Sequence, residues 1–303
     1  MRKNKVLAKR SHKYMGDRVF HAVSVCIVAA LTLIVFLPLL NVVSSSLSSS
    51  SAINAGKVLL WPVEFTLENY GTILKYKSVW IGYRNTVFYT VFGTFINVAM
   101  TMFCAYPLSQ RRFSGRKAVN LLLFFTMIFS GGMIPAYILV RDLHLMNKIW
   151  AILLPGAMSV YNVMITRNFI ESTIPDELED AARIDGCSPA KYFLYFIMPL
   201  SKTIIAVIAM YYAVDHWNNY FSAFMYLTDR NLYPLQLFLR DILINSTFDS
   251  SVVSDPDTAR AVQGLAQTLK YVVIVVSTLP LMCIYPFVQK YFVKGVMIGS
   301  VKG

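Results

Sequence analysis

Residues 87–107 read VFYTVFGTFINVAMTMFCAYP, a run of 21 residues without a formally charged side chain. About 20 apolar residues in a helix cross the ~30 Å hydrocarbon layer of a bilayer. Lipid offers no hydrogen-bonding partner to an open backbone, so a run of this kind must be helical inside a membrane. The stretch therefore predicts a membrane-spanning helix.

Five further apolar runs lie on either side of this one. They cover residues 19–43, 119–140, 149–169, 200–221 and 271–293, and each carries few or no formal charges. The first follows a basic segment, as the core of a signal peptide does, but it exceeds the 7–15 residues typical of such a core. We therefore predict an all-α integral membrane protein with six transmembrane helices.

The composition of the 303 residues fits a lipid environment. Hydrophobic residues make up 56% and charged residues 15%, against about 45–50% and about 25% in soluble proteins. The net charge of +12 does not indicate nucleic-acid binding, because the basic residues lie between apolar runs and not on one face. The four Cys and four His residues lack the spacing of a disulfide framework or a metal site, so we expect neither.

The distribution of Lys and Arg predicts the orientation. Eighteen of the 28 lie in residues 1–18, in the loop after the second run, around the loop after the fourth, and near the C-terminus. Loops rich in Lys and Arg stay in the cytoplasm. We therefore expect a basic cytoplasmic segment at 1–18, a transmembrane domain at 19–293 with a large cytoplasmic loop at 171–198, and a cytoplasmic tail at 294–303.

The segments on the opposite side of the membrane have a different character. Residues 44–51 (SSSLSSSS) are a polar connector by composition, and Trp61 and Trp80 suit the membrane interface. Residues 228–270 form a long polar stretch without a regular pattern. Stretches of this kind are usually functional loops or disordered, and we expect a loop here.

The most informative cytoplasmic stretch is residues 174–200, IPDELEDAARIDGCSPAKYFLYFIMPL. Pro175 suits the first turn of a helix, and Gly186 suits the left-handed position that ends one. Ser188 and Pro189 then read as the N-cap and first position of a second helix. Pro199 is expected to close that helix and open the fifth span, so we predict two short helices with a sharp joint.

The first of these helices has two interpretations. The Ala181–Ala182 pair would let another protein approach the backbone closely, with neighbouring acidic residues fixing the register. Alternatively, it is a solvated loop helix in which Glu179 and Arg183 form an ordinary i, i+4 pair. Helix chemistry alone favours the second interpretation.

The same stretch resembles the EAA loop of binding-protein-dependent ABC permeases. That pattern is E-A-A, three residues, G, nine residues, I, one residue, L-P. Here the spacing is kept, with Asp180 in place of the glutamate, Phe196 in place of the isoleucine and Met198 in place of the leucine. The shorter stem of Asp180 changes the reach of its contacts.

Four other segments resemble the carbohydrate branch of this family. They are RIDG at 183–186, RNT at 84–86, WNNY at 217–220, and the tail at 294–303, which is similar to that of MalG-like subunits. The resemblance implies a type I, MetI-like arrangement with 171–198 as the coupling loop. The residues that it assigns to coupling are Glu179, Asp180, Ala181, Ala182, Arg183, Asp185 and Gly186.

The resemblance also implies partners and a location. These are a second, MalF-like permease, a cytoplasmic ABC ATPase dimer with the tail reaching between its subunits, and an extracellular or periplasmic sugar-binding protein, all at a bacterial cell membrane. ATP and Mg would be bound by the ATPase. The sequence agrees independently, because it contains no GxxxxGK[ST] phosphate-binding loop. We therefore expect no cofactor in this chain and no enzymatic activity of its own.

Polar residues within the predicted spans are candidates for the substrate path. They are Asp215, His216, Trp217, Asn218, Asn219 and Tyr220 in the fifth span, and Tyr161 and Asn162 in the fourth. Such residues usually face a cavity or the bundle interior. The alternative is hydrogen bonding between helices, worth about 0.6–2 kcal/mol per bond, which we prefer for Tyr161 and Asn162. Gly131, Gly132 and Pro135 indicate a kink or a packing notch in the third span.

Three other functions remain open at this stage. A permease for an amino acid, peptide or ion would share the same coupling loop. An enzyme using Asp215 and His216 as an acid–base pair is disfavoured, because adjacent helical residues point about 100° apart. A stand-alone channel or secondary transporter is disfavoured slightly by the lack of an evident inverted repeat.

Overall fold

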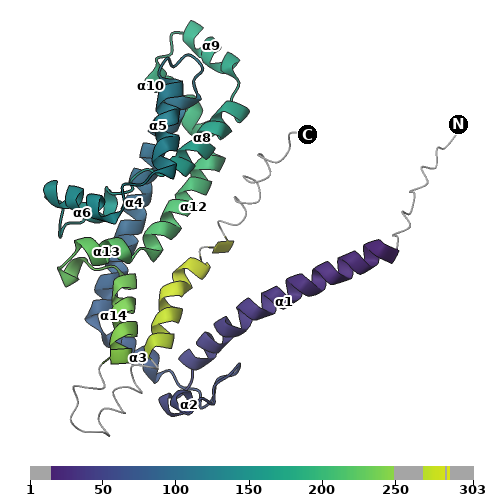
Figure 1. The fold of residues 1–303 in the computed structure, drawn as a ribbon, viewed down its shortest axis with the longest axis vertical. Coiled ribbons are helices and arrows are strands. Elements are labelled where there is room, and N and C mark those ends of the chain that lie inside the picture. The colour runs from purple at the N-terminus through teal and green to yellow at the C-terminus, as the bar shows by residue number, and fades with distance from the viewer. Residues whose placement is uncertain (1–14, 249–268, 284, 287–303) are drawn as a thin grey trace.

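The computed structural model describes residues 15–248, 269–283 and 285–286, which form a helical protein without strands in those ranges (Figure 1). In chain order the elements are α1 (Met15–Ser46), α2 (Ser50–Asn54), α3 (Glu68–Lys75), α4 (Lys77–Ser109), α5 (Arg116–Ile128), α6 (Met133–Asp142), α7 (Trp150–Leu153), α8 (Val160–Thr173), α9 (Asp176–Ile184), α10 (Pro189–Tyr192), a π-helical turn (Phe193–Ile197), α11 (Met198–Leu200), α12 (Lys202–Asn218), α13 (Phe221–Tyr226), a 3-10 turn (Arg230–Leu232) and α14 (Leu235–Phe248). A further apolar helix, Leu269–Cys283, follows.

Helix α4 is the centre of the bundle. It packs along α12 and α8, and it also contacts α14 and α5. Met102 and Leu108 on α4 are almost fully buried, in clusters that include Ile170 and Val163 of α8. The core therefore lies where α4, α8 and α12 meet.

Helix α1 runs apart from this bundle (Figure 1). Its 30 residues from Asp17 to Ser46 have a mean hydropathy of 2.8 in their most apolar window, and none of that window is buried. An isolated apolar helix of this length is stable only in lipid or against another protein. This matches the first predicted span.

The predicted runs differ in how continuous they are. Residues 17–46 and 77–109 each form one long apolar helix, so the first two predictions are confirmed. The run at 119–140 forms two helices, α5 and α6, bent by 113° at residues 129–132, where Gly132 has a φ of 86°. Of the kink and the packing notch that the sequence left open, the structure has a kink, and it is large enough to break the predicted single helix. The run at 149–169 is also broken, between α7 and α8.

The expectation of an irregular loop over residues 228–270 is wrong for its first part. Residues 230–248 contain the 3-10 turn and α14, whose Leu235, Leu237 and Leu239 are buried. Pro234 stands just before α14, at a position where its missing N–H costs nothing. The remaining residues of that predicted loop up to 268, most of the basic N-terminal segment and the tail at 294–303 lie outside the described residues.

The serine tract is a packed joint and not a simple polar connector. Ser44, Ser46 and Ser48 are all at most 5% exposed. The Ser44 hydroxyl donates to the carbonyl of Leu60 at 2.7 Å, and the Ser46 hydroxyl lies 2.8 Å from the hydroxyl of Tyr70. These bonds hold the end of α1 against α3 and the segment that leads to it.

Candidate functional site

The joint after α9 forms as the sequence predicts. Gly186 has a φ of 73°, in the left-handed region. The N–H of Cys187 donates to the carbonyl of Ala182 at 2.9 Å, and the N–H of Gly186 donates to that of Arg183 at 3.0 Å. This pair of bonds is the Schellman motif, which satisfies carbonyls that a helix end would otherwise leave unpaired.

The second short helix also begins as predicted, but it ends differently. The Ser188 hydroxyl accepts the N–H of Lys191 at 3.4 Å, with Pro189 in the first turn. The chain then passes through a π-helical turn that ends at Ile197, two residues before Pro199, which cannot donate a backbone hydrogen bond. The sharp change of direction, 79°, comes at Ser201 and not at Pro199.

The two alanines of the motif face in different directions. Ala182 is 7% exposed and packs in a cluster with Tyr192 and Phe193, whereas Ala181 is exposed. Only Ala181 is therefore available for close approach by another protein. Ile184, which sequence reasoning did not single out, is 87% exposed at the end of α9.

The loop between α4 and α5 is tied to α9 by two ion pairs. Arg112 Nη2 lies 2.8 Å from Asp180 Oδ1, and Arg111 Nε lies 3.1 Å from Asp176 Oδ2. All four side chains are more than half exposed, so each pair contributes on the order of 0.2–1 kcal/mol. Sequence reasoning missed Arg112 as a partner of Asp180, because the two are 68 positions apart.

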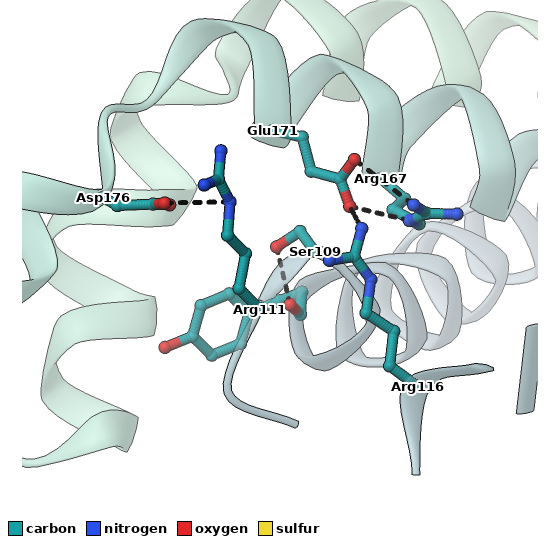
Figure 2. A network of polar contacts seen from close by, with 7 residues as sticks. Ser109, Arg111, Arg116, Arg167, Glu171 and Asp176 are labelled. Carbon is teal, nitrogen blue, oxygen red and sulfur yellow. Dashed lines mark hydrogen bonds and ion pairs between the residues drawn. The ribbon is translucent and has the colours of Figure 1, made fainter. Parts of the chain in front are cut away.

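A more enclosed network lies beside these pairs (Figure 2). Glu171 of α8 accepts from Arg167 Nε at 2.8 Å and also pairs with Arg116, the first residue of α5. These three side chains are 17–28% exposed. Figure 2 shows Glu171 between the two guanidinium groups, with the Arg111–Asp176 pair next to them. The network joins α5 and α8 at the base of the α9 segment.

Glu179 and Arg183 form the expected i, i+4 pair at 3.0 Å. Glu179 is the less exposed partner, at 15%. Burial, followed by the charges of Glu179 and Asp176, raises the pKa of Tyr192, so its phenol stays neutral. Helix α9 is thus anchored to the rest of the chain on its inner side, unlike a freely solvated loop helix.

The polar residues at the end of α12 fall into two groups. His216 and Trp217 are 7% and 5% exposed and point into the protein. The His216 ring lies 3.5 Å from the amide oxygen of Asn97, and Trp217 Nε1 donates to the carbonyl of Ser277 at 3.1 Å. Their packing supports the alternative that they join helices. Asp215, by contrast, is exposed.

The other candidates also divide by burial. Asn162 is 5% exposed and Tyr161 is 56% exposed. The side-chain oxygen of Asn219 accepts the N–H of Ser222 in the first turn of α13 at 3.2 Å. Asn218 and Tyr220 are exposed and line a cavity beside α14.

The RNT segment at 84–86 positions α14. Asn85 Nδ2 donates to the carbonyls of Asn231 at 2.6 Å and Tyr233 at 3.0 Å. Thr86 is fully buried, and its hydroxyl accepts the N–H of Leu235 at 2.8 Å. At Gly82 a Cβ would lie 3.0 Å from the Leu235 Cα, so only glycine allows this close approach. The first turns of α4 therefore fix where α14 begins.

Comparison with known proteins decides the family. Residues 78–298 match the family described as "Binding-protein-dependent transport system inner membrane component". The chain belongs to this family. Two Bacillus subtilis members, Protein LplC and the polygalacturonan/rhamnogalacturonan transport system permease protein YtcP, are each 37% identical to it. The alignments cover 96% and 95% of this chain and 98% and 100% of those proteins.

A solved structure agrees with the family assignment. A chain in the crystal structure of a bacterial ABC transporter that imports the acidic polysaccharide alginate matches with a TM-score of 0.83 and 33% identity. The match covers 92% of this chain and 98% of that chain. The predicted fold class, a helical membrane permease of the MetI-like type, is therefore confirmed. The family consists of transport components, which agrees with the expectation that this chain is not an enzyme.

Proposed function

We propose that this chain is the permease subunit of an ATP-driven carbohydrate importer, forms half of its pore, and receives force from a separate ATPase through α9. The observation that carries the proposal is similarity over nearly the whole chain to permeases named for saccharide transport. Besides YtcP, these include the melibiose/raffinose/stachyose import permease MelC of B. subtilis, 28% identical over 88% of this chain. A permease for peptides or amino acids would share the coupling loop, but these relatives favour saccharides.

The geometry of α9 suits the transmission of force. Its inner side is held by the burial of Ala182 and by the ion pairs of Asp176 and Asp180. Its outer side exposes Ala181 and Ile184. A push on the outer side would therefore move the attached α4–α5 loop and α10–α12 together, and would not be absorbed by a loose segment. ATP and Mg²⁺ belong to the ATPase dimer in this proposal.

The remaining partners and the orientation follow from the same proposal. A second permease completes the pore, and a binding protein delivers the saccharide to the outer side. The α9 segment and both termini lie in the cytoplasm, in agreement with the Lys and Arg distribution. Since YtcP is named for polygalacturonan and the solved relative imports alginate, acidic saccharides are included among the substrates to test.

Purification in mild detergent with a tag on this chain, followed by mass spectrometry, tests the assembly. We expect a second permease and an ATPase to co-elute, and uptake of labelled oligosaccharides by cells that carry the complex. A clean monomer or homodimer with transport activity of its own would contradict the proposal.

A pair of surface variants tests the role of α9. Ile184→Ser removes an 87% exposed side chain, so it should leave the fold intact while weakening ATPase association. Leu59→Ser removes a 73% exposed side chain far from α9 and serves as the matched control. Equal ATPase recovery with both variants would argue against α9 as the docking element.

A further inference from the structure

A cavity of about 460 Å³ lies between α14, the end of α12 and helix Leu269–Cys283. This volume is within the range of small-molecule sites, about 300–1,000 Å³. In Figure 1 these elements lie toward the opposite end of the molecule from α9. The side chains that matter here are Gln236 and Arg240 of α14, Asn218 and Tyr220, and Ser277 and Thr278.

Among the described residues that line the cavity, Arg240 is the one with a charged side chain. It is 31% exposed, and its guanidinium carbon lies 4.0 Å from the centre of the Phe224 ring. Stacking on an aromatic ring fixes the orientation of a guanidinium while leaving its N–H donors available.

Asp241 neutralises this guanidinium only weakly. Its Oδ1 lies 3.4 Å from Arg240 Nη1, longer than the 2.7–2.9 Å typical of a charge-assisted bond. Arg240 makes no other ion pair or hydrogen bond with the described part of the chain. A guanidinium carries five N–H donors, so most of them remain for a ligand.

Neutral hydrogen-bonding groups surround Arg240 in the cavity. The Asn218 amide donates to the carbonyl of Val214 at 2.8 Å, which leaves its oxygen as an acceptor. The Thr278 hydroxyl donates to the carbonyl of Ile274 at 2.9 Å and can still accept, whereas Ser277 is only 2% exposed. Gln236 makes no hydrogen bond with the described residues, and Tyr220 is 43% exposed and offers an aromatic face. Such acceptors and an aromatic ring suit the hydroxyls and C–H face of a sugar.

The helices that carry these groups are held rigidly. Asn85 and Thr86 fix the start of α14, and the Trp217 indole bonds the carbonyl of Ser277 on the neighbouring helix. The site is therefore built from anchored helices and does not depend on an adaptable loop, which favours a preformed binding site.

We propose that this cavity binds an acidic sugar, with Arg240 pairing with the carboxylate and the neutral groups binding the hydroxyls. A carboxylate that leaves water for a membrane interior loses hydration, and a fixed cation on the path offsets that loss. A neutral sugar would need the hydroxyl-binding groups but no guanidinium. The inference deepens the proposed function and rests on it, because it concerns which saccharides are carried.

The test uses the complete importer, with its binding protein, in vesicles of phosphatidylcholine. Initial rates of trigalacturonate uptake are measured at several concentrations for the wild type, Arg240→Gln and Arg240→Lys. Loss of a charge-assisted bond predicts a KM raised by about tenfold to a hundredfold in Arg240→Gln, with little change in kcat. Arg240→Lys, which keeps the charge without the planar fork, should lie between the two.

Arg230→Gln is the matched control, since Arg230 is exposed and does not line the cavity. It should import trigalacturonate with the wild-type KM. Co-elution of the ATPase shows whether each variant assembles. If Arg240→Gln does not assemble, the KM of Arg240→Lys is compared with that of the wild type to test the inference. An unchanged KM in an assembled Arg240 variant overturns the inference.

Two further outcomes separate the alternatives. A wild-type importer that carries neutral saccharides but not trigalacturonate overturns the inference and leaves the proposed function standing. If no saccharide is imported, the proposed function is contradicted, and so is the assignment of the cavity as a sugar site. If the Arg240→Gln effect appears only in vesicles that contain phosphatidylglycerol, the guanidinium binds a lipid headgroup and the inference is again overturned.

Discussion

Replacing Gly186 by alanine isolates the role of the left-handed joint after α9. No heavy atom outside the joint lies within 4 Å of the position that a Cβ would occupy, so the substitution introduces no clash. The backbone φ of 73° alone makes the variant unfavourable, by roughly 1–2 kcal/mol for a residue that is not glycine. We therefore expect local opening of the joint, with the rest of the bundle unchanged.

Hydrogen exchange of the assembled complex measures this opening directly. The N–H of Cys187 is protected by its bond to the Ala182 carbonyl, so its peptide should exchange about fivefold to thirtyfold faster in Gly186→Ala. Gly186→Asn should show a smaller effect, because asparagine tolerates the left-handed region. Gly71→Ala is the control, since Gly71 is helical with open space around it. Wild-type exchange in Gly186→Ala would refute the reasoning.

The same joint should matter for coupling. Gly186→Asp is expected to stay in the membrane but to lose substrate-stimulated ATPase activity or the ATPase itself, because it adds a negative charge to the exposed surface of the joint. Transport and ATPase association that both survive this change would contradict the assignment of α9 to coupling.

Three further predictions follow from single contacts. A double-mutant cycle of Arg112→Ala and Asp180→Ala, measured by thermal unfolding, should give a coupling energy of about 0.2–1 kcal/mol. A coupling energy of zero would show that this ion pair does not stabilise the protein. Gly93→Ala would place a Cβ 2.3 Å from His216 Nε2, so we expect a loss of about 1–3 kcal/mol in stability that His216→Ala restores. Thr86→Val leaves the backbone N–H at the start of α14 unpaired and should lower stability by about 1–3 kcal/mol, whereas equal melting temperatures would contradict this.

The features that the sequence predicted well are local. The cap at Gly186 and the N-cap at Ser188 each depend on residues within a few positions, so the amino-acid types determine them. Long uninterrupted apolar runs are equally local, which is why the first two spans are confirmed. The RNT and WNNY segments resemble signatures of the family's carbohydrate branch. The sequence does not show that they hold α14 and helix Leu269–Cys283 in place.

The features that the sequence did not predict depend on distant partners. Arg240 lies in a stretch whose polar composition suggested a loop, and only the contacts of Leu235 and Leu239 with other helices make it α14. Gly131 and Gly132 indicated a kink or a packing notch, and the sequence alone could not decide between them. The serine tract predicted only a polar connector, because composition shows polarity and not the hydrogen-bonding partners.

Helix α4 connects the two candidate sites, and its contacts suggest how one could affect the other. Its 33 residues span about 50 Å without a break. Asn85 near its start holds α14, and Arg112 just beyond its end holds α9. Between them, Gly93 lies so close to His216 of α12 that a Cβ at this position would be 2.3 Å from the His216 Nε2. A displacement of α9 should therefore reach α14 as a rotation of α4 about this contact, with the bend at Ser201 taking up the change in α12. If so, Gly93→Ala variants that still assemble should lose import while keeping their ATPase, whereas import that is retained would place the pivot elsewhere.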